Sequence, residues 1–248
     1  MRHPSHPTAI VWDFDGTLVD TRAKNMRVNQ RIIEEVTGKP ATDFEVMSCQ
    51  EIYDRAQRSS VNWREFYRLH FGLSEKETDR AGARWTPYQL SDGTPTPPLQ
   101  GIPETLGLFD GIPQGVVSQN CSSNIKSTLS SHGLSAFFGC IIGYTEVANL
   151  QQKPAPDGLL LAIDQLTDFA AGVVIYVGDH ETDLNTVHNA NRALQQRDLP
   201  VTVVSVAALY GMNGLQEGWT DLADYRAKAP RDVVEIARRL EEKSGGQR

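Results

Sequence analysis

Near its N-terminus the chain reads Ile10-Val11-Trp12-Asp13-Phe14-Asp15-Gly16-Thr17-Leu18-Val19-Asp20-Thr21, with two carboxylates directly after an apolar run. Residues 9–12 predict a short buried strand. Strand interiors disfavour Asp and Gly, so we expect the strand to end at Asp13 and the chain to turn at Asp15-Gly16. Many Asp-Gly pairs are ordinary hairpin turns. Asp13, however, comes before the turn, at the strand end where open α/β sheets bind their ligands.

Beyond residue 98, strand-like and helix-like patterns alternate. Apolar runs at 115–118, 140–142, 173–177 and 201–206 predict four further strands, and amphipathic segments separate them. Strands that alternate with helices indicate a parallel sheet covered by helices on both faces. We therefore predict an α/β fold with a doubly wound, parallel five-stranded sheet.

Residues 21–95 contain no convincing strand. Apolar and aromatic side chains recur there at spacings of three to four, which predicts an all-helical unit, and Gly72, Gly82 and Pro87 are expected to separate its helices. The Pro- and Gly-rich stretch 91–98 reads as a linker. We predict a core domain of residues 1–20 and 96–248, with residues 21–95 inserted as a helical cap domain.

The composition limits the class of partner. The 248-residue chain carries a net charge of −7, which argues against nucleic acid as the main partner. No apolar stretch approaches the roughly 18 residues of a membrane helix, and the N-terminus lacks a secretory h-region. Three cysteines without metal-ligand spacing favour reduced thiols in a cytoplasm. We expect a cytoplasmic monomer or homodimer that acts on a small molecule, with neither a nucleic acid nor a membrane as partner.

Several polar residues follow the predicted strands. Asp13 ends the first strand, Ser118 ends the second, and Gly178-Asp179 follows the fourth, while Lys153 lies in the loop before the helix that follows the third. The carboxyl ends of parallel strands share one edge of the sheet. We therefore expect these side chains to converge in one crevice.

Four motifs in order carry a resemblance to a known family. The stretch DFDGTLVDT (13–21) resembles the first motif of the haloacid dehalogenase superfamily, and VVSQN (116–120), QQKPAPD (151–157) and GDHETD (178–183) resemble the second, third and fourth. The match covers nearly the whole chain. It implies a Rossmann-type core with the small helical cap of subclass I, as in the phosphoglycolate phosphatase-like members, and most members are phosphatases.

The resemblance also implies the catalytic roles. Asp13 would attack phosphorus and form an aspartyl-phosphate, which divides one displacement into two easier steps. Asp15 would protonate the leaving alkoxide and then activate water. Ser118 would donate a hydrogen bond to a phosphoryl oxygen, and Lys153 would supply positive charge.

The remaining site residues bind phosphate and metal. Asp15, Gly16, Ser118, Gln119 and Lys153 are expected to contact the phosphate. The resemblance implies Mg²⁺ as the cofactor, because carboxylate and carbonyl oxygens are its preferred ligands. The expected metal-binding residues are Asp13, Asp15 through its backbone carbonyl, Asp179 and Asp183.

The substrate is less closely defined. In this subclass the cap reads the leaving group, and Arg55 and Arg58 are candidates for that role, although a solvated helix face explains them as well. The alternatives are a β-phosphoglucomutase-like phosphotransferase, a haloacid dehalogenase-type hydrolase and a phosphoacceptor module like a response-regulator receiver. Asp15 argues against a dehalogenase, since those enzymes resemble this chain but lack the second Asp and need no magnesium.

Overall fold

The structure is a computed structural model that describes residues 7–60, 62–109, 111–211 and 218–245. Contacts divide the chain into two compact units. One, the α/β unit, comprises the residues up to Asp20 and from Pro97 onward, and the other, the helical unit, is Thr21–Thr96. Among the helices in the described ranges, none is both long and apolar enough to cross a bilayer.

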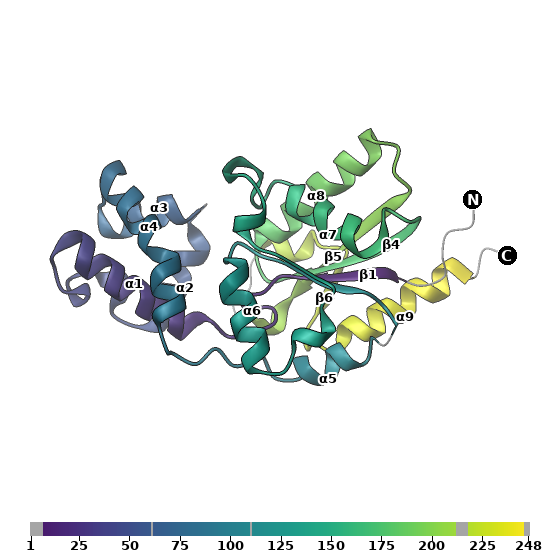
Figure 1. Cartoon of the computed structure of the whole chain (residues 1–248), viewed down its shortest axis with the longest axis horizontal. Coiled ribbons are helices and arrows are strands. Elements are labelled where there is room, and N and C mark those ends of the chain that lie inside the picture. Colours follow the sequence, from purple (N-terminus) through teal and green to yellow (C-terminus); the bar gives the residue numbers. More distant parts are fainter. Residues whose placement is uncertain (1–6, 61, 110, 212–217, 246–248) are drawn as a thin grey trace. The chain divides into compact units, whose positions relative to one another are not determined.

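The α/β unit is built on six parallel strands in the order β3-β2-β1-β4-β5-β6. Figure 1 labels β1, β4, β5 and β6 of this sheet. The strands are β1 (Pro7–Trp12), β2 (Gln114–Val117), β3 (Cys140–Ile142), β4 (Gly172–Gly178), β5 (Val201–Ala208) and β6 (Tyr225–Ala227). The helices are α5 (Ile102–Gly107), α6 (Ser122–Ser131), α7 (Asp157–Thr167), α8 (Glu181–Gln196) and α9 (Asp232–Gly245). The doubly wound parallel fold that the alternation predicted is confirmed.

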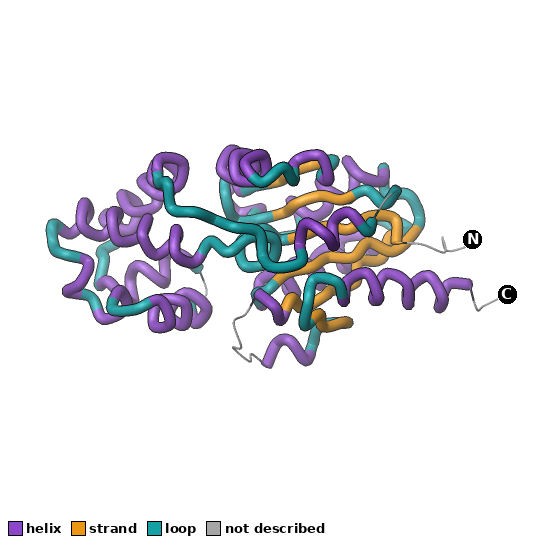
Figure 2. Tube along the Cα trace, turned by 90° about the horizontal axis from the view of Figure 1, so that it is seen from below, coloured by secondary structure: helices purple, strands orange, loops and turns teal. Residues whose placement is uncertain are grey.

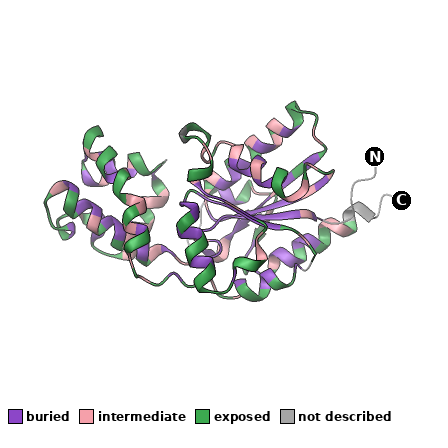
Figure 3. Ribbon diagram, in the orientation of Figure 1, coloured by how far each residue is buried: buried purple, intermediate pink, exposed green. Residues whose placement is uncertain are grey.

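Helices cover both faces of this sheet (Figure 2). Because side chains alternate along a strand, Ile10 and Trp12 of β1 pack into one hydrophobic core with residues of α5, α6 and α9. Ala9 and Val11 pack into the opposite core with residues of α7 and α8. Both faces are therefore apolar, and Figure 3 shows the central strands as almost entirely buried.

The predicted number of five strands is wrong, because β6 adds a sixth. It is three residues long, with the exposed Arg226 between Tyr225 and the buried Ala227, so it has neither the length nor the apolar content of a recognisable strand. Its pairing with Val206–Ala208 of β5 makes it part of the sheet. Tertiary pairing, not local propensity, forms this strand.

The strand order decides where a ligand would bind. The connections lead from β1 to β2 and β3 on one side of the sheet and then cross to β4, β5 and β6 on the other. The reversal lies between β1 and β4, and in open α/β sheets ligands bind beyond the carboxyl ends of the strands at this point. Asp13 follows β1 and Asp179 follows β4.

The helical unit contains α1 (Arg22–Thr37), α2 (Gln50–Ser59), α3 (Trp63–Phe71) and α4 (Glu75–Ser91). Its own core includes Ile32, Tyr53 and Phe66. Gly72 ends α3, as predicted, but Gly82 and Pro87 lie inside α4 and break no helix. A Cβ at Gly82 would lie 2.6 Å from the Trp63 ring, so that glycine provides room for packing between helices.

Candidate active site

A buried lysine joins two carboxylates at the carboxyl edge of the sheet. Lys153 Nζ lies 2.6 Å from Asp13 Oδ1 and 2.7 Å from Asp183 Oδ1. The side chain of Lys153 is only 5% exposed, that of Asp13 10% and that of Asp183 6%. Asp179 is also buried, and one oxygen from each of Asp13, Asp179 and Asp183 lies within 4.8 Å of the others. We call these three residues the acidic cluster.

The turn after β1 brings the acidic cluster together. Asp13 N–H donates to Val177 O of β4 at 2.8 Å, which continues the ladder as far as the first carboxylate. Gly16 then adopts a φ of +76°, and a Cβ there would lie 2.5 Å from Asp179 Oδ2. Glycine alone fits this position, because it combines a left-handed backbone with close approach to a carboxylate. Gly16 N–H donates to Val19 O and so closes the turn.

The first turn of α8 fixes Asp183. His180 is the N-cap, and its Nδ1 accepts a hydrogen bond from Thr182 N–H at 3.1 Å. Asp183 Oδ2 accepts from His180 N–H in return, which completes a capping box. Asp183 Oδ1 accepts from Tyr176 Oη at 3.1 Å as well as from Lys153. Asp183 therefore holds Lys153 in place, and His180 caps the N-terminus of α8.

Charge in this cluster is unbalanced. Burial raises the pKa of Asp13 well above its usual value; Lys153 opposes the rise, and the charges of Asp183, Asp179 and Asp15 add to it. Burial alone would lower the pKa of Lys153, but Asp13 and Asp183 raise it well above its usual value, so the ammonium stays protonated at neutral pH. One lysine faces several carboxylates, and additional positive charge would stabilise them.

Asp15 is held from the end of β2. Ser118 Oγ donates to Asp15 Oδ2 at 3.4 Å, and Asn120 Nδ2 lies 3.2 Å from both Asp15 oxygens. Gln119 is exposed, and its Nε2 donates to the backbone carbonyl of Lys153 at 3.0 Å. The residues that follow β2 thus contact both Asp15 and the lysine loop.

Two contacts of this site escaped the sequence analysis. Asn120 was part of the second motif but received no role, since an Asn two residues after a strand is most simply a helix cap. Tyr176 was counted as core in an apolar run, although its hydroxyl bonds Asp183 and its ring lies 5.2 Å from Lys153 Nζ. A polar tip inside a buried strand, three residues before an Asp, was the available signal.

The predicted specificity residues belong to the helical unit. Arg55 is exposed and Arg58 is half-buried on α2. The nearby Arg64 and Arg68 of α3 form ion pairs with acidic residues of α4, which is the solvated-face arrangement. A role for Arg55 and Arg58 in specificity stays a prediction.

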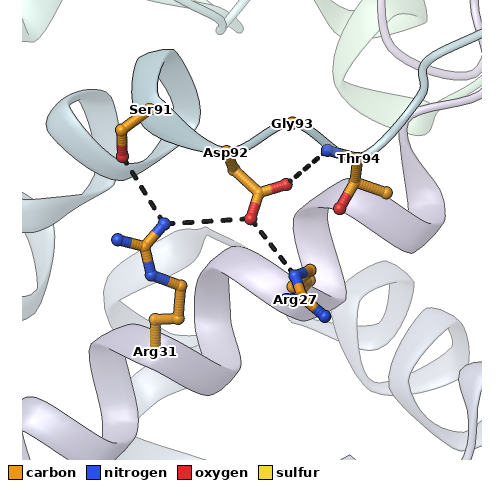
Figure 4. A pocket seen from close by; sticks show the side chains of 6 residues that line it. All are labelled: Arg27, Arg31, Ser91, Asp92, Gly93 and Thr94. Atoms are coloured by element: carbon orange, nitrogen blue, oxygen red, sulfur yellow. Dashed lines mark hydrogen bonds and ion pairs between the residues drawn. The ribbon is translucent and has the colours of Figure 1, made fainter.

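A hollow of about 430 Å³ lies elsewhere in the helical unit (Figure 4). Arg27 and Arg31 point from α1 toward Asp92, whose side chain is 4% exposed and 3.4 Å from Arg27 Nε. Asp92 Oδ1 also accepts from Thr94 N–H at 2.9 Å. We call Asp92, Arg27 and Arg31 the Asp92 cluster. The Asp92 carboxylate pairs with both arginines and with Thr94 N–H, so the hollow has no excess of negative charge like that of the acidic cluster.

The fold and the site define a doubly wound α/β protein with buried carboxylates and a lysine at its switch point. Residues 10–194 match the sequence profile of the haloacid dehalogenase-like hydrolases. The match covers most of the chain, so the chain belongs to this family and is a hydrolase, and the resemblance of the four motifs is confirmed.

Individual proteins extend the similarity over nearly the whole length. A phosphoglycolate phosphatase from Synechococcus elongatus is 26% identical over 241 residues, which cover 94% of this chain and 98% of the relative. A Lactobacillus plantarum structure with the provisional name phosphoglycolate phosphatase has a TM-score of 0.72 at 19% identity, covering 93% and 99% of the two chains. A Geobacter sulfurreducens hydrolase of the same superfamily has a TM-score of 0.61 at 22% identity, with the same coverage. At these identities, the two structures show a shared fold.

Proposed function

We propose that the chain is a Mg²⁺-dependent phosphatase that hydrolyses a small-molecule phosphate monoester through an aspartyl-phosphate on Asp13. The contact between Lys153 Nζ and Asp13 Oδ1, at 2.6 Å inside a buried cluster, carries this proposal. Two anions repel each other, so a phosphate can approach Asp13 only where positive charge is already in place. Lys153 supplies that charge in a buried environment, where it acts more strongly than in water.

In the first step, a carboxylate oxygen of Asp13 attacks phosphorus as the bond to the leaving oxygen breaks. Asp15 gives its proton to that oxygen, so an alcohol leaves instead of an alkoxide. Ser118 and Lys153 stabilise the transferring group through a hydrogen bond and a charge. The products are the alcohol and an aspartyl-phosphate on Asp13.

In the second step, Asp15, now a carboxylate, takes a proton from water, and the water oxygen attacks phosphorus. The bond between phosphorus and Asp13 breaks, which releases inorganic phosphate and restores the Asp13 carboxylate and the protonated Asp15. One residue serves as acid and then as base. The presence of Asp15 distinguishes this chemistry from that of a dehalogenase.

The donor set fits a magnesium ion. Asp13, Asp179 and Asp183 offer oxygens within 4.8 Å of one another. Burial raises the pKa of Asp13, and the neighbouring carboxylates add to the rise, so a cation bound there would favour the charged form. Asp13, Asp179 and the backbone carbonyl of Asp15 would hold the ion, with Asp183 nearby. Bound there, Mg²⁺ would neutralise charge on the transferring phosphoryl group.

The first substrate to test is 2-phosphoglycolate, because a relative of 26% identity is a phosphoglycolate phosphatase. A leaving group with a carboxylate suits Arg55 or Arg58, since arginine pairs well with carboxylates. We expect the enzyme to act in the cytoplasm as a monomer or homodimer, with free thiols at Cys49, Cys121 and Cys140.

The test is release of free phosphate from 2-phosphoglycolate and a panel of phosphorylated metabolites, with and without Mg²⁺. We expect many turnovers with Mg²⁺ and a loss of at least about 10⁴-fold in Asp13→Asn, by analogy with other removed nucleophiles. Circular dichroism confirms that the variant is folded. Mass spectrometry of the acid-quenched enzyme should find one phosphoryl group on the peptide that contains Asp13.

Other outcomes would replace the proposal. A stoichiometric burst without turnover indicates a phosphoacceptor module. Activity that depends on a sugar bisphosphate indicates a phosphotransferase, and chloride release from a 2-haloacid indicates a dehalogenase. Full activity in a folded Asp13→Asn protein contradicts the mechanism outright.

A further inference from the structure

Asn120 is a buried amide aimed at Asp15. The residue is 3% exposed, and its Nδ2 lies 3.2 Å from both Asp15 oxygens, although the two residues are 105 positions apart in sequence. The hydrogen bond from Ser118 Oγ to Asp15 Oδ2 is longer, at 3.4 Å. A carboxylate turns readily about its last torsion angle, which has broad wells. A donor placed evenly between its oxygens restricts that rotation.

Hydrogen bonds determine which way the amide faces. Asn120 Oδ1 accepts from Cys121 N–H at 2.8 Å and from Asn124 Nδ2 at 3.2 Å. If the amide were reversed, its NH₂ group would face these two donors and its oxygen would face the Asp15 carboxylate, so every contact would become repulsive. The orientation with Nδ2 on Asp15 therefore follows from the network.

The backbone of Asn120 is equally restrained. Its N–H donates to Ser118 Oγ at 3.1 Å, and its carbonyl accepts from Tyr144 N–H at 3.0 Å. Side chain and backbone are thus both held between the end of β2 and the start of α6. Such a residue can hold another in place, because it has little freedom itself.

We infer that Asn120 is a positioning residue that orients Asp15 for proton transfer to the leaving oxygen. The inference rests on the proposed phosphatase function. If Asn120 merely supported its loop, its loss would impair all substrates alike. If it orients the general acid, its loss should matter only where the leaving group needs a proton.

Two phosphate esters separate these cases through kcat/KM, which reports the steps up to departure of the leaving group. An alkyl phosphate such as 2-phosphoglycolate requires protonation of its leaving oxygen, whereas p-nitrophenolate leaves without it. In Asn120→Ala we expect kcat/KM for the alkyl ester to fall about 10–100-fold, the usual effect of losing such a supporting hydrogen bond. For p-nitrophenyl phosphate the fall should be less than about threefold on the same reasoning.

Three further variants complete the test. Asp15→Asn should show the same selective loss, and Asn120→Ala should add little to it, because the two residues act as one unit. Asn120→Asp keeps the shape and the acceptor but loses the donor toward Asp15, so it serves if the alanine variant does not fold. Asn191 is half-buried and bonds the backbone of Val203 through both amide atoms, so Asn191→Ala is the control that removes a hydrogen-bonded asparagine without changing the ratio of kcat/KM for the two esters.

Each result decides between the alternatives. A selective loss that is absent in Asn191→Ala and not additive with Asp15→Asn supports the inference. Equal losses for both esters, or additive losses, overturn it while the phosphatase function stands. If the unmodified enzyme hydrolyses neither ester with Mg²⁺, the proposed function fails and the inference fails with it.

Discussion

The two compact units both bury acidic side chains, but they balance the charge differently. In the acidic cluster, Asp13 and Asp183 share the single ammonium of Lys153, and Asp179 lies beside them. In the Asp92 cluster, one carboxylate faces two guanidinium groups, at 3.4 Å from Arg27 and 3.8 Å from Arg31. One cluster has too few cations and the other has enough.

This difference in charge balance distinguishes a ligand-binding site from a cluster that stabilises the fold. A balanced buried carboxylate stabilises the fold through its partners, as the lowered pKa of Asp92 indicates. An unbalanced one stores repulsion, and such repulsion is tolerated where a ligand or metal supplies the missing charge. The comparison predicts that the same kind of substitution has opposite effects in the two clusters.

The largest effect should come from Lys153→Met. The substitution leaves Asp13 and Asp183 buried without their cation, so we expect the free energy of unfolding in urea to fall by about 3–5 kcal/mol. Lys153→Arg keeps the positive charge, so its free energy of unfolding should fall less. Arg27→Met in the Asp92 cluster is the counterpart, with a change below about 1 kcal/mol because Arg27 is largely exposed. Equal losses in the two clusters would contradict the comparison.

Magnesium should have the next largest effect, and it should act on one cluster alone. At about 100 times its dissociation constant, Mg²⁺ should raise the free energy of unfolding by about 2.7 kcal/mol. This stabilisation should appear as a rise in the melting temperature when Mg²⁺ is added. Asp179→Asn should abolish that rise, whereas Asp92→Asn should retain it. Removing the ion with EDTA should reverse both the stabilisation and the activity. A rise that survives Asp179→Asn would place the ion elsewhere.

Asp13→Asn tests whether removing a negative charge from the acidic cluster stabilises or destabilises the fold. It removes one charge from a crowded set while Lys153 keeps Asp183 as a partner, so without Mg²⁺ we expect a gain in stability of about 1 kcal/mol. Activity should be lost in the same protein. The measurement is urea denaturation of both proteins in EDTA. A clear loss of stability would mean that Lys153 already balances the cluster.

Asp92→Asn should change the stability in the opposite direction and by a similarly small amount, a loss of about 1 kcal/mol at pH 7. Burial would raise the pKa of Asp92, but the hydrogen bonds from Thr94 and the charges of Arg27 and Lys24 lower it below its usual 3.8. In the pH range below that value, the unfolded chain binds more protons than the folded one. The contribution of Asp92 is therefore complete above about pH 4 and declines as the pH falls through the folded pKa.

The measurement is urea denaturation of the parent protein and Asp92→Asn at several pH values. Their difference in stability should shrink below about pH 4, where Asp92 becomes protonated in both the folded and unfolded states. A difference that stays constant at all pH values would show that the charge of Asp92 contributes nothing.

Local patterns predicted much of the fold. The run before Asp13 and the alternation after residue 98 suffice for a doubly wound parallel sheet, because periodicity and turn residues act over a few neighbours. Gly82 and Pro87 were expected to end helices, yet α4 continues through both. Packing of α4 against its neighbours outweighs the local cost of these residues.

The site was less accessible to such reasoning. Its residue types could be listed from the four motifs, but Asn120 and Tyr176 matched ordinary cap and core patterns. Their relevance depends on contacts with Asp15 and Asp183, and the first of these spans 105 positions. No local pattern around Asn120 encodes its contact, and for Tyr176 the local signal is limited to a polar hydroxyl inside a buried strand.

The sequence by itself determined which carboxylates, hydroxyls and amines stand at strand ends, because that depends on order and periodicity along the chain. The tertiary structure alone decided that Lys153 lies 2.6 Å from Asp13, across 140 positions, and that β6 joins the sheet. Both depend on the packing and pairing of distant segments. Charge balance in a buried cluster is a property of that packing, and it is what distinguishes Asp13 from Asp92.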